Sequence, residues 1–294
     1  MGDTIPAATD AALARLAYLQ EPNIQSQLGA VPELEGWSVE WGPTSFGSLD
    51  SALLLSKLPE NLNRRTQSAL VLRSRIPDCE RLFDSLDLSL GSLPWRQPGL
   101  QQAECSSNLV RSATQLMEQL GGPQTDSLLD RLNLAAPNTD LRIIGHSTGG
   151  ALACLMALWI RHVLQPLHAI GIWPRVFGAP TPGNEVFAVA FKRCFPRATH
   201  FASSLDMSPL TWSVDGLEKI LHLFPEGRGP SALERGLLHV AKKEIATLGY
   251  TQIEGQVALN AKPRNDLPFQ PHAKWQHHIE QYLELLRSPT LVVQ

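Results

Sequence analysis

The stretch that decides the fold reads Leu141-Arg142-Ile143-Ile144-Gly145-His146-Ser147-Thr148-Gly149-Gly150-Ala151. Its first part, around Ile143-Ile144, predicts a short buried strand, and the alanine- and leucine-rich run from Gly150 to Ile160 predicts a buried helix. Between them, residues 145–149 spell G-x-S-x-G. A strand, a tight turn and a helix are the context that a nucleophile elbow requires, and glycines suit the flanking positions because so sharp a turn leaves no room for side chains.

The predicted turn presents one hydroxyl group. It lifts the Oγ of Ser147 above the sheet at the N-terminus of the helix, where backbone N–H groups and the helix dipole favour a developing oxyanion. The alternative interpretation is a glycine-rich turn that only joins a core strand to a core helix. The motif alone does not decide between these two interpretations.

Length and composition set broad limits. The 294 residues suffice for one large α/β domain or two small ones, and we expect a single domain over residues 1–294. A hydrophobic content of 43% can build a substantial core. The 25 Lys and Arg residues face 28 Asp and Glu residues, the net charge is −3, and no basic patch is visible. This charge pattern does not favour a nucleic-acid partner.

No targeting segment is recognisable in the sequence. Residues 1–14 lack a basic stretch followed by an apolar core, so we expect no cleaved signal peptide. The longest apolar run, from Ala151 to Ile160, ends at Arg161 and is too short to cross a bilayer. The expected location is therefore the cytoplasm as synthesised, with secretion without a signal peptide as the alternative.

The four cysteines do not predict a metal site. Cys79, Cys105, Cys154 and Cys194 lack the close paired spacing of zinc ligands. We expect free and mostly buried thiols, and we expect Cys154, inside the predicted elbow helix, to serve packing rather than chemistry. We expect the protein to need neither a metal nor a cofactor.

The N-terminal part predicts helices followed by strands. Residues 1–35 are expected to form a helical segment, with helices over Ala11–Leu19 and Asn23–Leu28. Alternating or apolar patterns predict three strands: Trp37–Trp41, which Gly42-Pro43 should end, Ala52–Leu55 and Ser68–Leu72.

The segment from Ile76 to Leu90 has two interpretations. Cys79, Leu82, Phe83 and Leu86 share one face at helical spacing. An amphipathic helix of this kind is ordinarily a surface helix. The alternative is a mobile lid whose apolar face covers a functional site.

Strands and helices alternate through the middle of the chain. Helices are expected over Ser106–Leu120, Ser127–Leu134 and Glu185–Phe195, and strands over Arg175–Phe177 and Ala198–Ser203. A helix over residues 279–286 follows near the end. This alternation predicts an α/β fold with a mostly parallel central sheet and helices on both faces.

A nucleophilic serine needs a base, and the base needs an acid that orients it. In hydrolases with an elbow, the order along the chain is Ser, then Asp or Glu, then His, and the acid lies after a later strand. Asp206 fits this position, because it follows the predicted strand that ends at Ser203. The alternative for Asp206 is a turn carboxylate that caps the next segment.

Several histidines are candidates for the base. Five of them follow Asp206, namely His222, His239, His272, His277 and His278. The loop before the last helix is the expected place, which favours the pair His277-His278. His146 lies within the elbow and cannot swing round to the serine beside it.

Four stretches together match the motifs of one known family. Residues 145–150 resemble its elbow G-H-S-[LT]-G-G, and Phe177–Asn184 resembles its F-G-x-P-x-x-G-N stretch. Asp206 with Pro209 resembles its acid motif D-x-x-P. Residues 277–282 resemble an H-x-x-x-x-Y region, which points to His277 rather than His278. The chain thus resembles the class 3 lipases, the fungal-type triacylglycerol lipase family, in its bacterial form.

This resemblance implies an α/β-hydrolase-type fold and a serine carboxylic-ester hydrolase. The implied substrate is a lipid ester, cleaved in the manner of a triacylglycerol lipase or a phospholipase A through an acyl-enzyme, at a lipid–water interface. The implied triad is Ser147, Asp206 and His277, with the backbone N–H groups of Thr148 and Arg75 forming the oxyanion hole. The resemblance also implies a lid over residues 76–95.

The sequence departs from the family pattern at one point. Members carry R-G-[ST] after an early strand, where this chain reads Arg73-Ser74-Arg75. The third residue therefore lacks a hydroxyl and adds a charge, which bears on the strength of the oxyanion hole. Two alternatives stay open: a catalytically impaired lipid-binding protein of the same fold, and an acyltransferase on the same scaffold.

Overall fold

A computed structural model describes residues 6–46, 50–59, 65–74, 88–120, 139–164, 171–224, 229–264 and 266–288. Its centre is a sheet in the order β1-β2-β3-β6-β7-β9-β11. The bounds of these strands are Trp37–Phe46, Asp50–Lys57, Thr66–Arg73, Thr139–His146, Gly171–Phe177, Thr199–Ser203 and Gln256–Leu259.

Most of this sheet is parallel. Strands β3, β6, β7, β9 and β11 pair in parallel, whereas β1 and β2 extend one side in antiparallel fashion. Parallel strands are covered on both faces and therefore consist of apolar runs, and Leu141, Ile143 and Ile144 of β6 are fully buried. The predicted α/β fold with a mostly parallel central sheet is confirmed.

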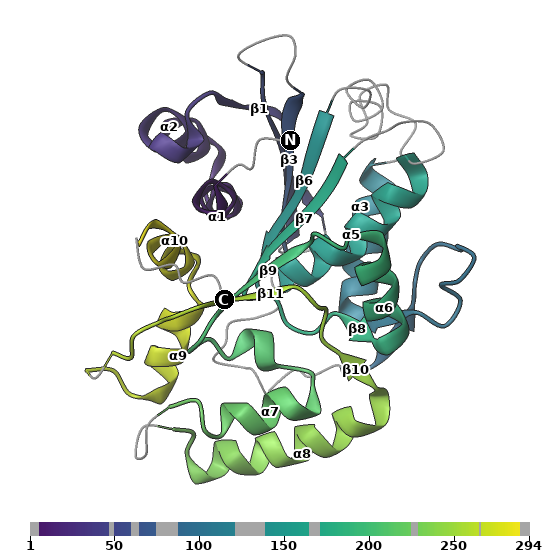
Figure 1. The fold of residues 1–294 in the computed structure, drawn as a ribbon, viewed down its shortest axis with the longest axis vertical. Coiled ribbons are helices and arrows are strands. Elements are labelled where there is room, and N and C mark those ends of the chain that lie inside the picture. The colour runs from purple at the N-terminus through teal and green to yellow at the C-terminus, as the bar shows by residue number, and fades with distance from the viewer. Residues whose placement is uncertain are drawn as a thin grey trace.

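Helices cover both faces of the sheet (Figure 1). On one face lie α3 (Ser107–Leu120), α5 (Thr148–Leu164) and α6 (Glu185–Cys194); on the other lie α1 (Ala7–Leu16), α2 (Glu21–Ala30) and α10 (Ile279–Arg287). Successive side chains of a strand point to opposite faces, so Ile143 packs on the α5 side and Ile144 on the α1 side.

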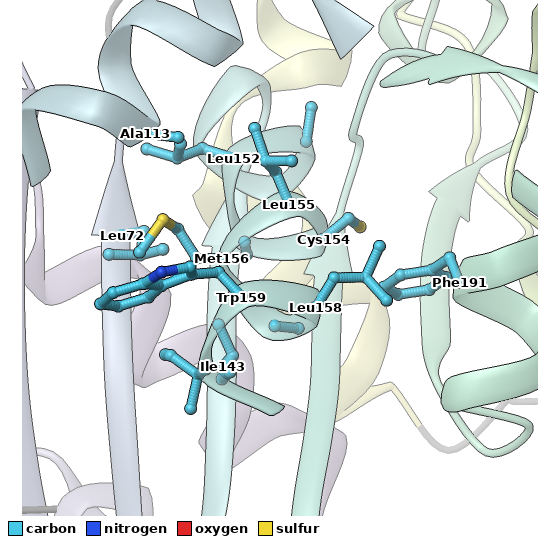
Figure 2. Packing of buried hydrophobic residues seen from close by; sticks show 14 of the residues in the cluster. Leu72, Ala113, Ile143, Leu152, Cys154, Leu155, Met156, Leu158, Trp159 and Phe191 are labelled. Carbon is cyan, nitrogen blue, oxygen red and sulfur yellow. The ribbon is translucent and has the colours of Figure 1, made fainter. Parts of the chain in front are cut away.

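Helix α5 is the buried centre of the first face. All of its residues from Gly149 to Ile160 are buried, which is typical of a helix that is apolar all round. Figure 2 shows Met156 and Trp159 next to Leu72 of β3, and Leu158 next to Phe191 of α6. The elbow at the start of α5 therefore rests on a fully packed helix.

Further elements lie at one end of the sheet, low in Figure 1. There α8 (Ala232–Leu248) packs Leu238, Ala241 and Ile245 against α7 (Val214–Ile220), and α9 (Phe269–His277) leads into α10. A small second sheet has the order β10-β8-β5-β4, with bounds Tyr250–Thr251, Gly183–Asn184, Glu104–Ser106 and Leu90–Ser92. Among the helices in the described ranges, none has the length and apolar character to span a membrane.

The prediction that Gly42-Pro43 ends the first strand is wrong. Strand β1 continues to Phe46, and Gly42 takes a left-handed φ of 80° within it. The pairing with β2 shifts register between Val39 and Trp41 and again between Trp41 and Thr44. An edge strand tolerates such irregularities, because a proline there need not donate to a neighbouring strand.

The predicted amphipathic segment is only partly visible. Residues 75–87 lie outside the described residues, and they include Arg75, Cys79 and most of the predicted lid. The predicted helix over Ser127–Leu134 lies outside the described residues as well. Leu90 begins strand β4, so the predicted helix does not extend to that residue. Cys105 and Cys154 are buried free thiols, as expected, and Cys194 is partly exposed.

Candidate active site

Ser147 lies in the turn between β6 and α5. Its φ is 59°, a left-handed value that is unusual for a residue with a side chain. The Ser147 N–H donates to the Phe177 carbonyl at 2.9 Å, and the Ser147 carbonyl accepts from Gly150 N–H at 2.8 Å. The turn is thus hydrogen-bonded on both sides and projects the serine from the end of the strand.

The two glycines of the motif are required by space. A Cβ on Gly145 would lie 2.1 Å from the Gly149 carbonyl oxygen, and a Cβ on Gly149 would lie 2.5 Å from the Leu72 carbonyl oxygen. Both distances are far below van der Waals contact. The helix can therefore approach its preceding strand and β3 only when both positions lack a side chain.

His277 connects Ser147 to Asp206. Its Nε2 lies 2.8 Å from the Ser147 Oγ, and its Nδ1 lies 2.9 Å from Asp206 Oδ2. The side chain of His277 is 12% exposed and that of Asp206 only 1%. A carboxylate can only accept, so Nδ1 carries the proton and Nε2 is free to accept the serine proton. The structure thus brings together the three residues that the sequence predicted as a triad.

Asp206 is held by donors on both oxygens. It follows β9, its Oδ1 accepts from the Ser208 N–H at 2.8 Å, and its Oδ2 accepts from the Tyr282 hydroxyl at 2.6 Å. These bonds fix the plane of the carboxylate. Asp215, the other nearby aspartate in sequence, is exposed in the first turn of α7.

Tyr282 is a residue of the site to which the sequence analysis gave no role. It is fully buried on α10, and its hydroxyl also accepts from the Ser203 N–H at 3.2 Å. Burial and the neighbouring Asp206 charge raise the pKa of the Tyr282 phenol well above its usual value, so the hydroxyl stays a donor. Its place in the H-x-x-x-x-Y stretch was the available signal.

The backbone opposite Tyr282 leaves room for these contacts. Gly178 has a φ of 56°, and a Cβ there would lie 2.7 Å from both Asp206 Oδ2 and the Tyr282 hydroxyl. A side chain at position 178 would therefore clash with Asp206 and Tyr282, so this position requires glycine.

His277 was predicted in a loop, but it is the last residue of α9. His278 follows it as the N-cap of α10, where its Nδ1 accepts from the Glu280 N–H at 3.3 Å. The two adjacent histidines thus have different contacts: His278 caps α10, and His277 lies at the serine.

The predicted oxyanion hole is described on one side only. Thr148 is the first residue of α5, and the first N–H groups of a helix have no acceptor within the helix. The Thr148 hydroxyl donates to the Ser74 carbonyl at 2.6 Å, which fixes the end of β3 beside the elbow. Arg75, the predicted second donor, follows Ser74 directly but lies outside the described residues.

Part of the chain matches a known protein family. Residues 94–214 match the family model described as lipase (class 3), a range that includes Ser147 and Asp206. No curated protein matches the chain in sequence.

Solved lipase structures share the fold. The M37 lipase has a TM-score of 0.81 and 21% identity, over 95% of this chain and 91% of that chain. A lipase from Rhizopus microsporus var. chinensis has a TM-score of 0.54 and 17% identity, over 70% and 67%. A triacylglycerol lipase whose catalytic centre is formed by a serine protease triad has a TM-score of 0.54 and 14% identity, over 86% and 78%.

Proposed function

We propose that this chain, which matches the class 3 lipase model over residues 94–214, is a serine carboxylic-ester hydrolase that cleaves lipid esters through an acyl-enzyme on Ser147. In this proposal Asp206 and His277 complete the triad. The observation that carries it is the unbroken hydrogen-bonded path from Asp206 through His277 to Ser147, with steps of 2.9 and 2.8 Å.

The proposed reaction has two halves. His277 Nε2 takes the Ser147 proton while Oγ attacks the ester carbonyl, and Asp206 stabilises the imidazolium that forms. The N–H groups of Thr148 and Arg75 bind the oxyanion, and loss of one such donor typically costs about 10²–10³ in kcat. His277 then protonates the leaving alcohol, and a water molecule repeats the sequence to release the fatty acid.

We propose triacylglycerols or phospholipids of A-type cleavage as the substrate class. Support comes from the family match and from the similar triacylglycerol lipase with its serine protease triad. The reaction on either lipid is the same attack on a carboxylic ester. The two substrate classes differ because only a phospholipid carries a headgroup. A direct comparison of hydrolysis rates on both lipids can separate them.

The test is hydrolysis by the wild type and by Ser147→Ala. Substrates are short- and long-chain nitrophenyl esters, a triacylglycerol emulsion and phospholipid vesicles. We expect activity that falls by several orders of magnitude in Ser147→Ala and that rises at the lipid interface. Full activity in this variant would refute the assignment, and activity on soluble esters alone would restrict the protein to a simple esterase.

A fluorophosphonate probe separates the proposal from a lipid-binding protein without turnover. An activated Ser147 reacts with the probe, whereas an inert hydroxyl does not. Labelling that is absent in the wild type would favour the binding protein. Transfer of the acyl group to an added alcohol in preference to water would favour the acyltransferase.

A further inference from the structure

His146 is a buried polar residue that the proposed proton path does not use. It is the last residue of β6 and stands directly before Ser147, with 6% of its surface exposed. Both of its ring nitrogens nevertheless have partners. Nδ1 lies 2.7 Å from the Tyr18 hydroxyl, and Nε2 lies 2.7 Å from the main-chain carbonyl oxygen of His277.

The partners fix the tautomer of His146. A carbonyl oxygen can only accept, so Nε2 carries a proton and donates it to His277. Burial, followed by the neighbouring His277, lowers the pKa of His146 well below its usual value, so the ring is neutral. Nδ1 is then an acceptor, and the Tyr18 hydroxyl is its donor.

The bond between His146 and His277 spans two distant segments. His146 ends the strand of the nucleophile, and His277 lies 131 residues later, at the junction of α9 and α10. The two imidazole rings are also in contact, with centroids 4.7 Å apart and planes tilted by 31°. One face of the His277 ring is thereby covered by His146.

These contacts restrict the base in two ways. The hydrogen bond holds its main chain against the strand that carries Ser147, and the ring contact limits rotation of its side chain. A base held by its backbone, its ring face and Asp206 retains the 2.8 Å approach to the serine. Displacement of a reacting group by about 1 Å can cost 10²-fold in rate.

Tyr18 reaches His146 from a different layer. It lies in the turn after α1, and the guanidinium of Arg73, at the end of β3, is 6.0 Å from the centre of its ring. Its ring also meets the His146 ring edge-on, with centroids 5.7 Å apart. Helix α1 lies on the same face of the sheet as α10, which follows the base (Figure 1).

We infer that His146 is a positioning residue for His277, and that Tyr18 selects the tautomer in which His146 does this. The inference rests on the proposed function, because it assigns a task to residues around the proposed base. By this inference the N-terminal segment contributes to the active site through Tyr18. Any buried histidine needs hydrogen-bond partners, but the acceptor for His146 is the main chain of the proposed base itself.

The first test replaces His146 with a matched pair. Gln and Met have similar size and shape, but only the Gln side chain carries an N–H that can donate to the His277 carbonyl. For a soluble nitrophenyl ester we expect His146→Met to lower kcat about 100-fold with KM unchanged. His146→Gln should stay within about tenfold of the wild type. Equal losses in both variants would refute the positioning role.

The second test removes one hydroxyl. Tyr18→Phe should lower kcat about five- to tenfold without changing KM, and should lower the thermal midpoint by about 2–4 °C because the buried Nδ1 of His146 loses its donor. In the His146→Met background the same change should have no further effect, since the acceptor is absent. The control is Glu280→Gln, which breaks the 3.4 Å ion pair between Arg15 of α1 and Glu280 of α10 without touching His146. An equal loss of kcat in this control would mean that loosening of α1 explains the effect.

Two further readouts keep the inference separate from the proposed function. Nitrogen-15 NMR of labelled histidine should show His146 as the neutral Nε2–H tautomer in the wild type, even if His146→Met fails to fold. Any other tautomer would refute the inference. Activity that survives Ser147→Ala would refute the proposed function. Activity that requires Ser147 but is unchanged in Tyr18→Phe and His146→Met would refute only the positioning role.

Discussion

The Tyr282 hydroxyl links stability and catalysis in one hydrogen bond. It donates to Asp206 Oδ2 at 2.6 Å and accepts from the Ser203 N–H at 3.2 Å, and the whole side chain is buried. Tyr282→Phe removes this one oxygen and preserves the ring that packs against Phe177. The change therefore deletes two hydrogen bonds and very little apolar contact.

The expected cost follows from the two partners. A hydrogen bond to a charged group is worth about 1.5–3 kcal/mol, and an orphaned buried N–H costs about 1–3 kcal/mol. We therefore expect the free energy of unfolding to fall by about 3 kcal/mol. Asp206 keeps the Ser208 N–H on Oδ1 but loses one of two donors on the oxygen that holds His277. A loss of about 1.4 kcal/mol in transition-state stabilisation would lower kcat about tenfold.

Urea denaturation and ester hydrolysis measure the two effects. The matched control is Tyr250→Phe, because the Tyr250 hydroxyl is also buried but donates to an uncharged acceptor, the Leu88 carbonyl, at 3.2 Å. We expect this control to cost about 1 kcal/mol of stability and to leave kcat for a soluble ester unchanged. If Tyr282→Phe cost no more than the control and kept its kcat, the charged hydrogen bond would not have the importance assigned to it.

Three further predictions concern the acid, the elbow and pH. Asp206→Asn should lower kcat by several orders of magnitude and Asp215→Asn should have little effect, as ester hydrolysis measures; equal effects would mean that the acid is misassigned. Gly149→Ala should prevent folding or abolish activity, while Gly236→Ala, with nothing within 4 Å of the new Cβ, should raise the free energy of unfolding by about 0.5–1 kcal/mol in urea. Burial lowers the pKa of His200 from 6.5 to about 4, so the unfolded chain binds the proton first. The free energy of unfolding should therefore fall by up to roughly 3 kcal/mol from pH 6.5 to 4, and by less in His200→Asn.

The parts of the fold that follow from local sequence were predictable. The elbow needs only glycines at two positions, an apolar strand before it and an apolar helix after it, and all of these lie within residues 141–160. The parallel sheet follows from the alternation of strands and helices, because a parallel connection needs a crossover. The edge strand β1 was harder, since a proline inside it imitates a strand end.

Helix α8 shows a signal that the sequence analysis did not use. Ser231 caps this helix by accepting from the Glu234 N–H, and the Glu234 side chain accepts from the Ser231 N–H. This reciprocal pair is the S-x-x-E capping box, which is readable in sequence. Strand β11 had no comparable signal, because its four residues are strand-like only through pairing with β9.

In the candidate site, only the residues that lie within a recognisable local motif were predictable from the sequence. Ser147 and Asp206 were candidates from their places after predicted strands, and the resemblance was needed to choose them over the alternatives and to separate His277 from its neighbour. The contact between Tyr18 and His146 joins residues 128 positions apart, and no local pattern reports it. Contacts of this kind depend on how helices on one face of the sheet are placed.

The placement of α1 itself has a physical basis. Asp10 of α1 is buried, with its carboxylate 3.1 Å from the guanidinium of Arg142 on β6 and 3.7 Å from that of Arg175 on β7. The Asp10 Oδ1 and the Nε atoms of both arginines lack an aligned hydrogen bond, and burial raises the pKa of Asp10 to about 6. Such a buried cluster of three charged groups contributes little to stability, because desolvation offsets the attraction. The two arginines stand on neighbouring strands, and the Asp10 carboxylate lies near both. Helix α1 is thus held against β6 and β7 at Asp10, and Tyr18, in the turn after the same helix, reaches His146 at the end of β6.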